Sequence, residues 1–236
     1  MNPPVAIITG SSQGIGAGLV AGYRSAGYAV VGVARSAPSA DPDDSDYIAI
    51  AGDIADAHTA RRAVDAARDR FGRIDTLINN AGIYIGKPFT DYTFDEYQAI
   101  TAVNLTGFFR ITQLAIAEMV ARGSGHVVNV STSLVDNADS TRPSALPALT
   151  KGGLVAASRS LAVEYASRGV RVNAVSLGVI ETPDHDPASY VGLEAIHPLG
   201  RLGEVSDVVD AILYLERATF VTGDTLHVDG GQAAGR

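Results

Sequence analysis

A cluster of glycines near the N-terminus has the spacing of an anion-binding turn. Residues 9–16 read TGSSQGIG, follow a short β-branched run and precede an apolar helical pattern. In such a unit Gly10 permits a tight turn, Gly14 lets the backbone approach a pyrophosphate, and Gly16 lets helix and strand pack closely. The helix N-terminus then offers unpaired N–H groups to the anion. The pattern predicts a dinucleotide site, although glycines can also serve only to pack a turn.

Further polar residues stand where strands are expected to end. They are Asp53, the run NNAG at 79–82, Asn104 within VNLTG, and Lys151 within TKGG. In a doubly wound sheet the loops after the strands build the site. These residues are therefore candidates for the same site as the glycine turn.

The elements that must position these residues follow from hydrophobic patterning. Short β-branched runs alternate with longer amphipathic stretches, which is typical of βαβ units and a parallel sheet. The pattern predicts helices in most of the intervals between strands and a single doubly wound α/β domain over residues 1–236. The segment 104–122 carries an apolar stripe of the kind used for core or subunit packing. Strands are predicted at residues 5–9, 29–33, 47–51, 74–78, 126–130, 170–175 and 225–228.

Three stretches have the composition of loops. They are 36–46, rich in Pro, Ser and Asp, then 136–147, and 181–198, which contains His185, Tyr190 and three prolines. The second and third are candidate walls of a substrate site, and we expect 181–198 to form a substrate loop.

Composition excludes several classes of function. The 236 residues carry a net charge of −8 without a basic run, which argues against a nucleic-acid partner. No apolar stretch approaches the roughly 18 residues of a membrane span, and the N-terminus lacks signal-peptide features, so we expect a cytoplasmic protein without a membrane partner. The absence of cysteine rules out disulfides and Cys-based zinc sites. His185 and His197 have no evident third zinc ligand nearby. Redox chemistry would therefore need a borrowed cofactor.

Taken together, these motifs resemble the short-chain dehydrogenase/reductase family. The resemblance rests on the Gly-x3-Gly-x-Gly turn, on Asp53, NNAG, Asn104 and Lys151, and on the C-terminal runs RLGEVSDVVDAILYL and VTGDTLHVDGG, so it covers nearly the whole chain. It implies a Rossmann-type, seven-stranded parallel sheet with helices on both faces, a nicotinamide cofactor, a small carbonyl or alcohol substrate, and a homotetramer or homodimer.

The resemblance also implies which residues bind the cofactor. Asp53 would face the adenine, Asn80 and Gly82 would line the ribose, Lys151 would bind the nicotinamide ribose hydroxyls, and Thr182 would contact the nicotinamide amide. The alternative for Thr182 is that it caps a helix. The alternative for Lys151 is that it serves only to solvate the surface of its helix. The implied set is Gly10, Ser12, Gln13, Gly14, Ile15, Gly16, Arg35, Asp53, Ile54, Asn80, Ala81, Gly82, Lys151, Gly178, Ile180 and Thr182.

Arg35 favours NADP over NAD. An acidic residue after the second strand would bind the adenosine ribose and repel an extra phosphate, whereas an arginine there accommodates the phosphate. Arg35 occupies that place, and Gln13 sits where many NADP-dependent relatives carry a basic residue. The alternative is an ordinary solvated arginine paired with nearby carboxylates such as Asp41, Asp43 or Asp44.

The catalytic set implied by the resemblance is incomplete. Family members are expected to use Asn, Ser, Tyr and Lys, with the tyrosine four residues before the lysine. Here that place holds Pro147, which has no ionisable group, and the serine place holds Thr132. Asn104, Thr132 and Lys151 remain as the predicted catalytic residues. The interval from Thr132 to Lys151 is two residues longer than expected, so Ser131 or Ser133 could take the serine's role.

Several groups could replace the missing acid. They are Ser144, Tyr84, Tyr190, His185 or a water held by Asn104, and spacing does not choose among them. Tyr165 lies too far along its helix to do so. Leu177 is a further departure, because the family usually has proline before the glycine after the sixth strand.

The main hypothesis is an NADP-linked oxidoreductase that interconverts a carbonyl and an alcohol. Positioned proton transfer contributes roughly 10²- to 10⁴-fold in rate, so losing the tyrosine need not abolish hydride transfer. Two alternatives remain: a catalytically degenerate protein that binds the dinucleotide, and a non-redox lyase or isomerase.

Overall fold

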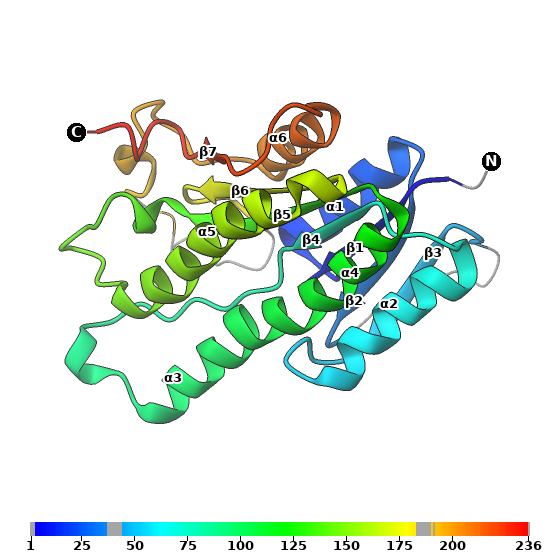
Figure 1. Cartoon of the computed structure of the whole chain (residues 1–236). Helices are drawn as coiled ribbons and strands as arrows, with labels where there is room; N and C mark the ends of the chain where they lie inside the picture. The colour runs from blue at the N-terminus through cyan, green and yellow to red at the C-terminus, as the bar shows by residue number, and fades with distance from the viewer. Residues whose placement is uncertain (1–2, 37–43, 183–189, 191, 236) are drawn as a thin grey trace.

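Seven parallel strands form one sheet in the order β3-β2-β1-β4-β5-β6-β7 (Figure 1). The computed structural model describes residues 3–36, 44–182, 190 and 192–235. The strands are β1 (Val5–Thr9), β2 (Ala29–Ala34), β3 (Tyr47–Ala51), β4 (Thr76–Asn79), β5 (Gly125–Thr132), β6 (Val170–Leu177) and β7 (Thr225–Val228). The predicted fold class is confirmed. The strand order reverses beside β1, where open α/β sheets bind their ligands.

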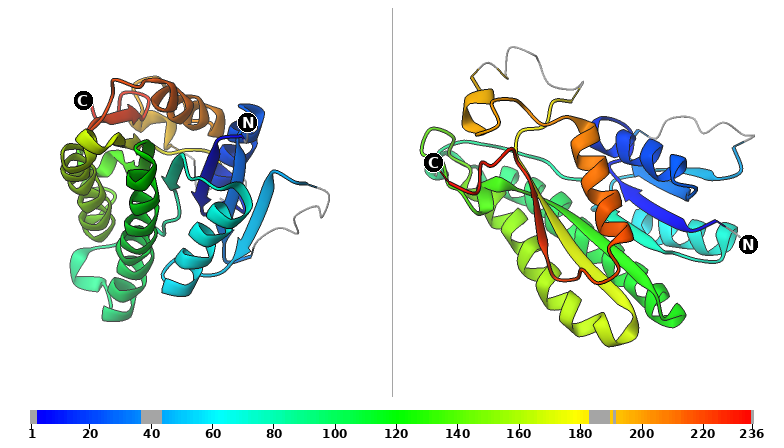
Figure 2. Two further views of the ribbon diagram at one scale, coloured as in Figure 1. Left: turned by 45° about the vertical axis from the view of Figure 1, so that its right-hand side comes forward. Right: turned by 90° about the horizontal axis from the view of Figure 1, so that it is seen from above.

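Helices cover both faces of the sheet (Figure 2). Alternate residues of β1 point to opposite faces, so Val5 and Ile7 join one hydrophobic core and Ala6 and Ile8 join the other. One core contains residues of α2 (Ala57–Phe71), α4 (Phe108–Arg122) and α5 (Ala145–Tyr165), and the other contains residues of α1 (Gly14–Ser25) and α6 (Val205–Arg217). Both faces of the sheet are thereby removed from water.

The connection between β4 and α4 is helical and carries a π-helical segment. It comprises η1 (Phe89–Asp91), α3 (Phe94–Thr101) and η2 (Ala102–Gly107), which runs directly into α4. Contrary to the sequence analysis, the run Phe94–Arg122 has the length and hydropathy of a membrane span, and 39% of its most apolar window is buried. Its α4 half buries Ile111, Ala115 and Met119 in the core, as the apolar stripe predicted.

The strand and helix boundaries differ from the predictions at the edge that carries the site. β4 begins and ends later than predicted, while β5 reaches Thr132 and β6 reaches Leu177. The predicted loop 136–147 ends early, because α5 begins at Ala145 and includes Pro147 in its first turn. Proline is tolerated there because the first N–H groups of a helix have no intrahelical acceptor.

The other two predicted loops lie partly outside the described residues. Within the described part, the chain after β6 forms the short helix η6 (Glu194–Ile196), and Ile180 makes an isolated parallel bridge with Gly203. The remaining short helices are η3 (Ser133–Val135) after β5 and η4 (Ala166–Arg168) after α5.

Candidate active site

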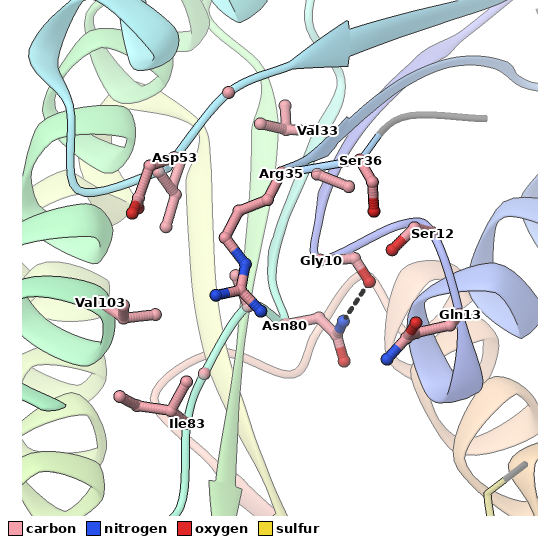
Figure 3. Close-up of a pocket in the computed structure, with 15 residues that line it drawn as sticks. Gly10, Ser12, Gln13, Val33, Arg35, Ser36, Asp53, Asn80, Ile83 and Val103 are labelled. Atoms are coloured by element: carbon pink, nitrogen blue, oxygen red, sulfur yellow. Dashed lines mark hydrogen bonds between the residues drawn. The ribbon is translucent and has the colours of Figure 1, made fainter. Parts of the chain in front are cut away.

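A pocket lies at the carboxyl ends of β1, β2 and β4, where the strand order reverses (Figure 3). It brings together nine of the predicted cofactor residues: Gly10, Ser12, Gln13, Arg35, Asp53, Ile54, Asn80, Ala81 and Gly82. Val33, Ala34, Ser36, Gly52, Ile83 and Val103 complete its wall. Residues from five separate parts of the sequence therefore meet in one hollow.

The glycine turn has the shape that its composition predicted. Gly10 and Gly14 adopt positive φ angles of 69° and 51°, which side-chain-bearing residues rarely adopt. A Cβ atom at position 16 would lie 1.8 Å from the Gly10 carbonyl oxygen, so only glycine fits between turn and helix. Gln13 precedes α1 without capping it, and Figure 3 shows its amide at the pocket.

Thr9 and Asn80 lock this turn to the loop after β4. Thr9 Oγ1 accepts hydrogen bonds from the backbone N–H groups of Asn80 and Ala81 at 3.1 and 3.0 Å. The Asn80 side chain returns hydrogen bonds to the carbonyl oxygens of Thr9 and Gly10 at 2.9 and 3.2 Å. The role of Thr9 could not be predicted from the sequence, because a β-branched residue at a strand end predicts only a strand.

Arg35 extends into the pocket from the end of β2 (Figure 3). Its side chain is exposed, and none of the described carboxylates forms an ion pair with it. Asp44, one of the predicted partners, pairs with Arg24 instead, and Asp41 and Asp43 lie outside the described residues. Ser12 and Ser36 line the same pocket, so it holds hydroxyl groups as well as the guanidinium.

Asp53 and Ile54 form the wall opposite the glycine turn. Asp53 Oδ1 accepts a hydrogen bond from the Ala55 N–H at 2.9 Å, which fixes the carboxylate before α2 begins. Ile54 is 7% exposed and packs against the π-helical segment, because a Cβ atom at Gly107 would lie 2.8 Å from its side chain.

Three hydrogen bonds hold the Asn104 side chain to the protein. Its Oδ1 accepts from the Ile83 N–H at 2.9 Å, and its Nδ2 donates to the Ile83 carbonyl and to Thr150 Oγ1, both at 3.1 Å. Both amide hydrogens are thus used, so the side chain has no N–H left to donate to a relay water. Asn104 instead clamps the chain after NNAG to α5.

Lys151 reaches from α5 to the same place. Its Nζ donates to the Val130 carbonyl at 2.7 Å, and a Cβ atom at Gly82 would lie 2.9 Å from that Nζ. Part of the side chain remains accessible, yet burial lowers the pKa of the ammonium from 10.5 to about 8. Two of its three N–H groups remain to bind a ligand hydroxyl.

The serine position is occupied by a half-buried hydroxyl. Thr132 ends β5, and its Oγ1 accepts a 3.4 Å bond from the Leu134 N–H. The two alternative serines are engaged elsewhere: Ser131 donates to the Lys151 carbonyl at 3.2 Å, and Ser133 donates to Gln232 Oε1 at 2.8 Å. Among the described residues, Thr132 is the one of the three whose hydroxyl has no assigned acceptor for its proton.

The candidate proton donors differ in the hydrogen bonds that their hydroxyl groups make. Tyr84 Oη lies 2.8 Å from Ser144 Oγ at the start of α5. Tyr190 Oη instead accepts from the Thr182 N–H at 3.0 Å and donates to the Thr182 carbonyl at 3.3 Å. His185 lies outside the described residues. Tyr165 is the last residue of α5, as expected.

Three predicted cofactor residues after β6 do not line this pocket. Gly178 borders a neighbouring hollow with His197 and Asp229, and a Cβ atom there would lie 2.8 Å from His197 Nε2. Ile180 is buried, and Thr182 is bound to Tyr190 as described. Gly14, Ile15, Gly16 and Lys151 are also absent from the lining, although Lys151 lies next to Gly82.

The donor set fits a nicotinamide dinucleotide. At Gly10 and Gly16 a Cβ atom would lie 3.0 and 1.8 Å from its nearest neighbours, so these two positions leave room only for backbone, and a diphosphate can approach the N–H groups of the turn. Asp53 provides an acceptor opposite this turn, and Arg35 provides a fork of donors. Among the described residues, no cluster of three or more His, Asp or Glu side chains could hold a metal ion.

Comparison with known sequences gives matches over nearly the full length. A family model described as "Enoyl-(Acyl carrier protein) reductase" matches residues 10–233. A putative ketoacyl reductase of the granaticin polyketide synthase of Streptomyces violaceoruber is 37% identical, covering 97% of this chain and 95% of that protein. The 3-oxoacyl-[acyl-carrier-protein] reductase FabG of Salmonella typhimurium is 33% identical, covering 96% of each.

Solved structures show the same fold. A short-chain type dehydrogenase/reductase from Mycobacterium marinum superposes with a TM-score of 0.91 at 29% identity, over 98% of this chain and 96% of that one. A gluconate 5-dehydrogenase from Burkholderia cenocepacia, in complex with NADP and tartrate, superposes with a TM-score of 0.88 at 30% identity, over 100% of this chain and 97% of that one. A 3-ketoacyl-(acyl-carrier-protein) reductase from Brucella melitensis, complexed with NADH, gives 0.89 at 30% identity over 98% of both.

Proposed function

Because this chain belongs to the short-chain dehydrogenase/reductase family, we propose that it uses NADP(H) to interconvert a carbonyl and an alcohol on a small organic substrate. Its relatives support a nicotinamide dinucleotide cofactor and carbonyl/alcohol oxidoreduction. The proposal adds the preference for NADP and a proton donor that is not a tyrosine at position 147.

The observation that carries the proposal is the position of Arg35. Its guanidinium extends into the pocket, which Ser12 and Ser36 also line, and no described carboxylate forms an ion pair with it. A 2′-phosphate on the adenosine ribose would find a bidentate, charge-assisted partner there. An acidic residue, which would select NAD by repelling that phosphate, is not among the described lining residues at the end of β2.

The chain's own residues have distinct proposed roles in the reaction. The bound cofactor would supply or accept the hydride at its nicotinamide ring. Lys151 would orient the ribose hydroxyls with its two remaining N–H groups and add positive charge near the reacting oxygen. Thr132 would hydrogen-bond the substrate oxygen from the end of β5, and Asn104 would fix the Ile83 backbone.

The test is a comparison of both coenzymes with a panel of carbonyl compounds. Affinities for NADPH and NADH are measured by fluorescence titration, and turnover is measured with ketones, aldehydes, quinones and a 3-oxoacyl thioester. We expect tighter binding of NADPH and measurable reduction of at least one compound. Cofactor binding without turnover across the panel would contradict the oxidoreductase proposal.

Pro147 favours a second candidate, a protein that binds the dinucleotide without redox chemistry. The position that would carry the family's acid instead holds a buried ring with no exchangeable proton. Any stereospecific hydride transfer would exclude this candidate. A lyase or isomerase would form product with no change in the oxidation state of the cofactor, which product analysis by mass spectrometry distinguishes.

We also propose that the protein assembles as a homotetramer or homodimer, in which each subunit is a single domain. We further propose that it is located in the cytoplasm and that residues 181–198 form the substrate loop. Phe109 on α4 and Val163 on α5 are exposed apolar side chains that such an assembly would cover. Light scattering coupled to size-exclusion chromatography tests the assembly. A monomer at micromolar concentration would contradict it.

A further inference from the structure

We propose that Tyr84, supported by Ser144, donates the proton that a tyrosine at position 147 would otherwise supply; this assignment rests on the proposed function. The two hydroxyl oxygens lie 2.8 Å apart, although the residues are 60 positions apart in the sequence. Ser144 Oγ also lies 2.8 Å from the Arg142 carbonyl, which can only accept. The serine proton therefore goes to Arg142, and the Tyr84 hydroxyl is the donor to Ser144.

Ser144 stands on the correct face of α5. It precedes Lys151 by seven residues, which is close to two helical turns, so Ser144, Pro147 and Lys151 share one stripe of the helix. A serine at this position normally caps its helix, yet the Ser144 side chain makes no capping bond. Its hydroxyl is instead directed to Arg142 and Tyr84, one turn beyond the place where the family's tyrosine would stand.

Tyr84 extends from a segment that is anchored at Lys151. Gly82 lies against Lys151 Nζ, and Asn104 holds both the N–H and the carbonyl of Ile83. The backbone that precedes Tyr84 is therefore fixed relative to α5. A Cβ atom at Gly86 would lie 2.4 Å from the Tyr84 hydroxyl, so the absence of a side chain at Gly86 leaves room for the phenol.

The Tyr84 phenol also remains available to a substrate. Its side chain is 58% exposed, so much of the ring faces solvent. By contrast, Tyr190 is 8% exposed and its hydroxyl is bound on both sides to the Thr182 backbone. Asn104 has no free N–H group. Of the described side chains that could replace the acid, the Tyr84–Ser144 pair alone combines an exchangeable proton with access.

The proposed step balances as follows. In the reducing direction, the carbonyl carbon would receive a hydride from a bound reduced nicotinamide, and the electron pair of the C=O π bond would move to oxygen. The Tyr84 O–H would turn from Ser144 to that oxygen and give it the proton, leaving the alcohol, the oxidised cofactor and a tyrosinate. Ser144 can then turn its hydroxyl toward the tyrosinate and stabilise it until the exposed ring regains a proton from water. Oxidation of the alcohol follows the reverse course.

The decisive variant is Tyr84→Phe, with Tyr165→Phe as the matched control at the far end of α5. We expect Tyr84→Phe to lower kcat about 10²- to 10⁴-fold, the usual contribution of positioned proton transfer, without changing the dissociation constant for NADPH. The control should keep wild-type kcat. Ser144→Ala should lower kcat only about 5- to 10-fold, as expected for one supporting hydrogen bond.

A readout independent of turnover comes from ¹³C NMR of protein labelled at the tyrosine ζ carbon. The signal missing from Tyr84→Phe identifies Tyr84. In protein loaded with oxidised NADP, which cannot reduce a ketone, we expect this signal to move when a ketone from the active panel binds. We expect the signal assigned to Tyr165 to stay in place.

The outcomes distinguish the assignment from the function on which it rests. If the wild-type protein binds NADPH but reduces nothing, the proposed function fails and the assignment fails with it. If the wild type is active and Tyr84→Phe retains its kcat, only the assignment fails. A Tyr84 signal that does not respond to the ketone would also overturn the assignment, because it would show that the phenol does not meet the substrate.

Discussion

Replacing Lys151 with methionine should show how much the buried ammonium destabilises the fold and how much it contributes to cofactor binding. Burial lowers the pKa of Lys151 from 10.5 to about 8, so the folded protein disfavours the charged form. One unit of pKa corresponds to about 1.4 kcal/mol, so keeping this ammonium protonated costs the fold at most about 3 kcal/mol near neutral pH. Methionine retains an unbranched chain of similar length and removes the charge.

The sign of the pH dependence follows from this shift. Between pH 8 and 10.5 the unfolded chain binds more protons at Lys151 than the folded chain does, so stability rises with pH. From pH 7 to 9.5 the wild type should gain roughly 2 kcal/mol relative to Lys151→Met. At pH 7 the variant should be as stable as the wild type or more stable, because the lost hydrogen bond to Val130 offsets only part of the gain.

The assay is urea denaturation without cofactor at both pH values. Lys87→Met is the matched control, because Lys87 is the only other lysine and makes a surface ion pair with Glu96 at 2.6 Å. It should change stability by less than about 1 kcal/mol and follow the wild-type pH dependence. The stabilisation that saturating NADPH gives to the wild type should shrink in Lys151→Met. Parallel pH curves for wild type and Lys151→Met would refute a desolvated ammonium.

Three further predictions concern the pocket and the core. Arg35→Asp should weaken NADPH binding about 10- to 100-fold and leave NADH binding unchanged, because a charge-assisted hydrogen bond to the phosphate becomes a repulsion. Titration with both coenzymes measures the two affinities. Gly16→Ala should lower the thermal midpoint and NADPH affinity together, since its Cβ would meet the Gly10 carbonyl; unchanged affinity would contradict the proposed turn. Burial lowers the pKa of His126, and that of Glu216 is lowered by its bond to His126 despite burial. The His126 shift predicts stability that is complete above about pH 6.5 and falls below it, and the Glu216 shift predicts a further loss only below about pH 4.5; denaturation at pH 7.5, 6, 5 and 4 measures both.

Much of the architecture could be predicted because it depends on local patterns. The alternation of β-branched runs with amphipathic stretches specified the sheet, and the glycine spacing specified the turn at Gly10. The boundary at Pro147 was wrong for a physical reason. Proline signals a loop in most contexts, but in the first turn of α5 its missing N–H costs nothing.

The candidate site was predictable only where a motif specified it. Asn104 was identified, but its clamp on Ile83 depends on a fold that brings residues 21 positions apart together. Tyr84 and Ser144 are 60 positions apart, farther than Asn104 and Ile83, and no periodic pattern in the sequence indicates their contact. Spacing therefore identified the missing acid and could not choose its replacement.

The most direct test of the account follows the hydride itself. NADPH carrying deuterium at C4 of the nicotinamide, in each of its two stereochemical forms, is incubated with the protein and a ketone, and the alcohol is analysed by mass spectrometry. The account predicts deuterium on the carbinol carbon from one of the two forms only. Tight binding of NADPH with no deuterium in any product, from any ketone of the panel, would contradict it.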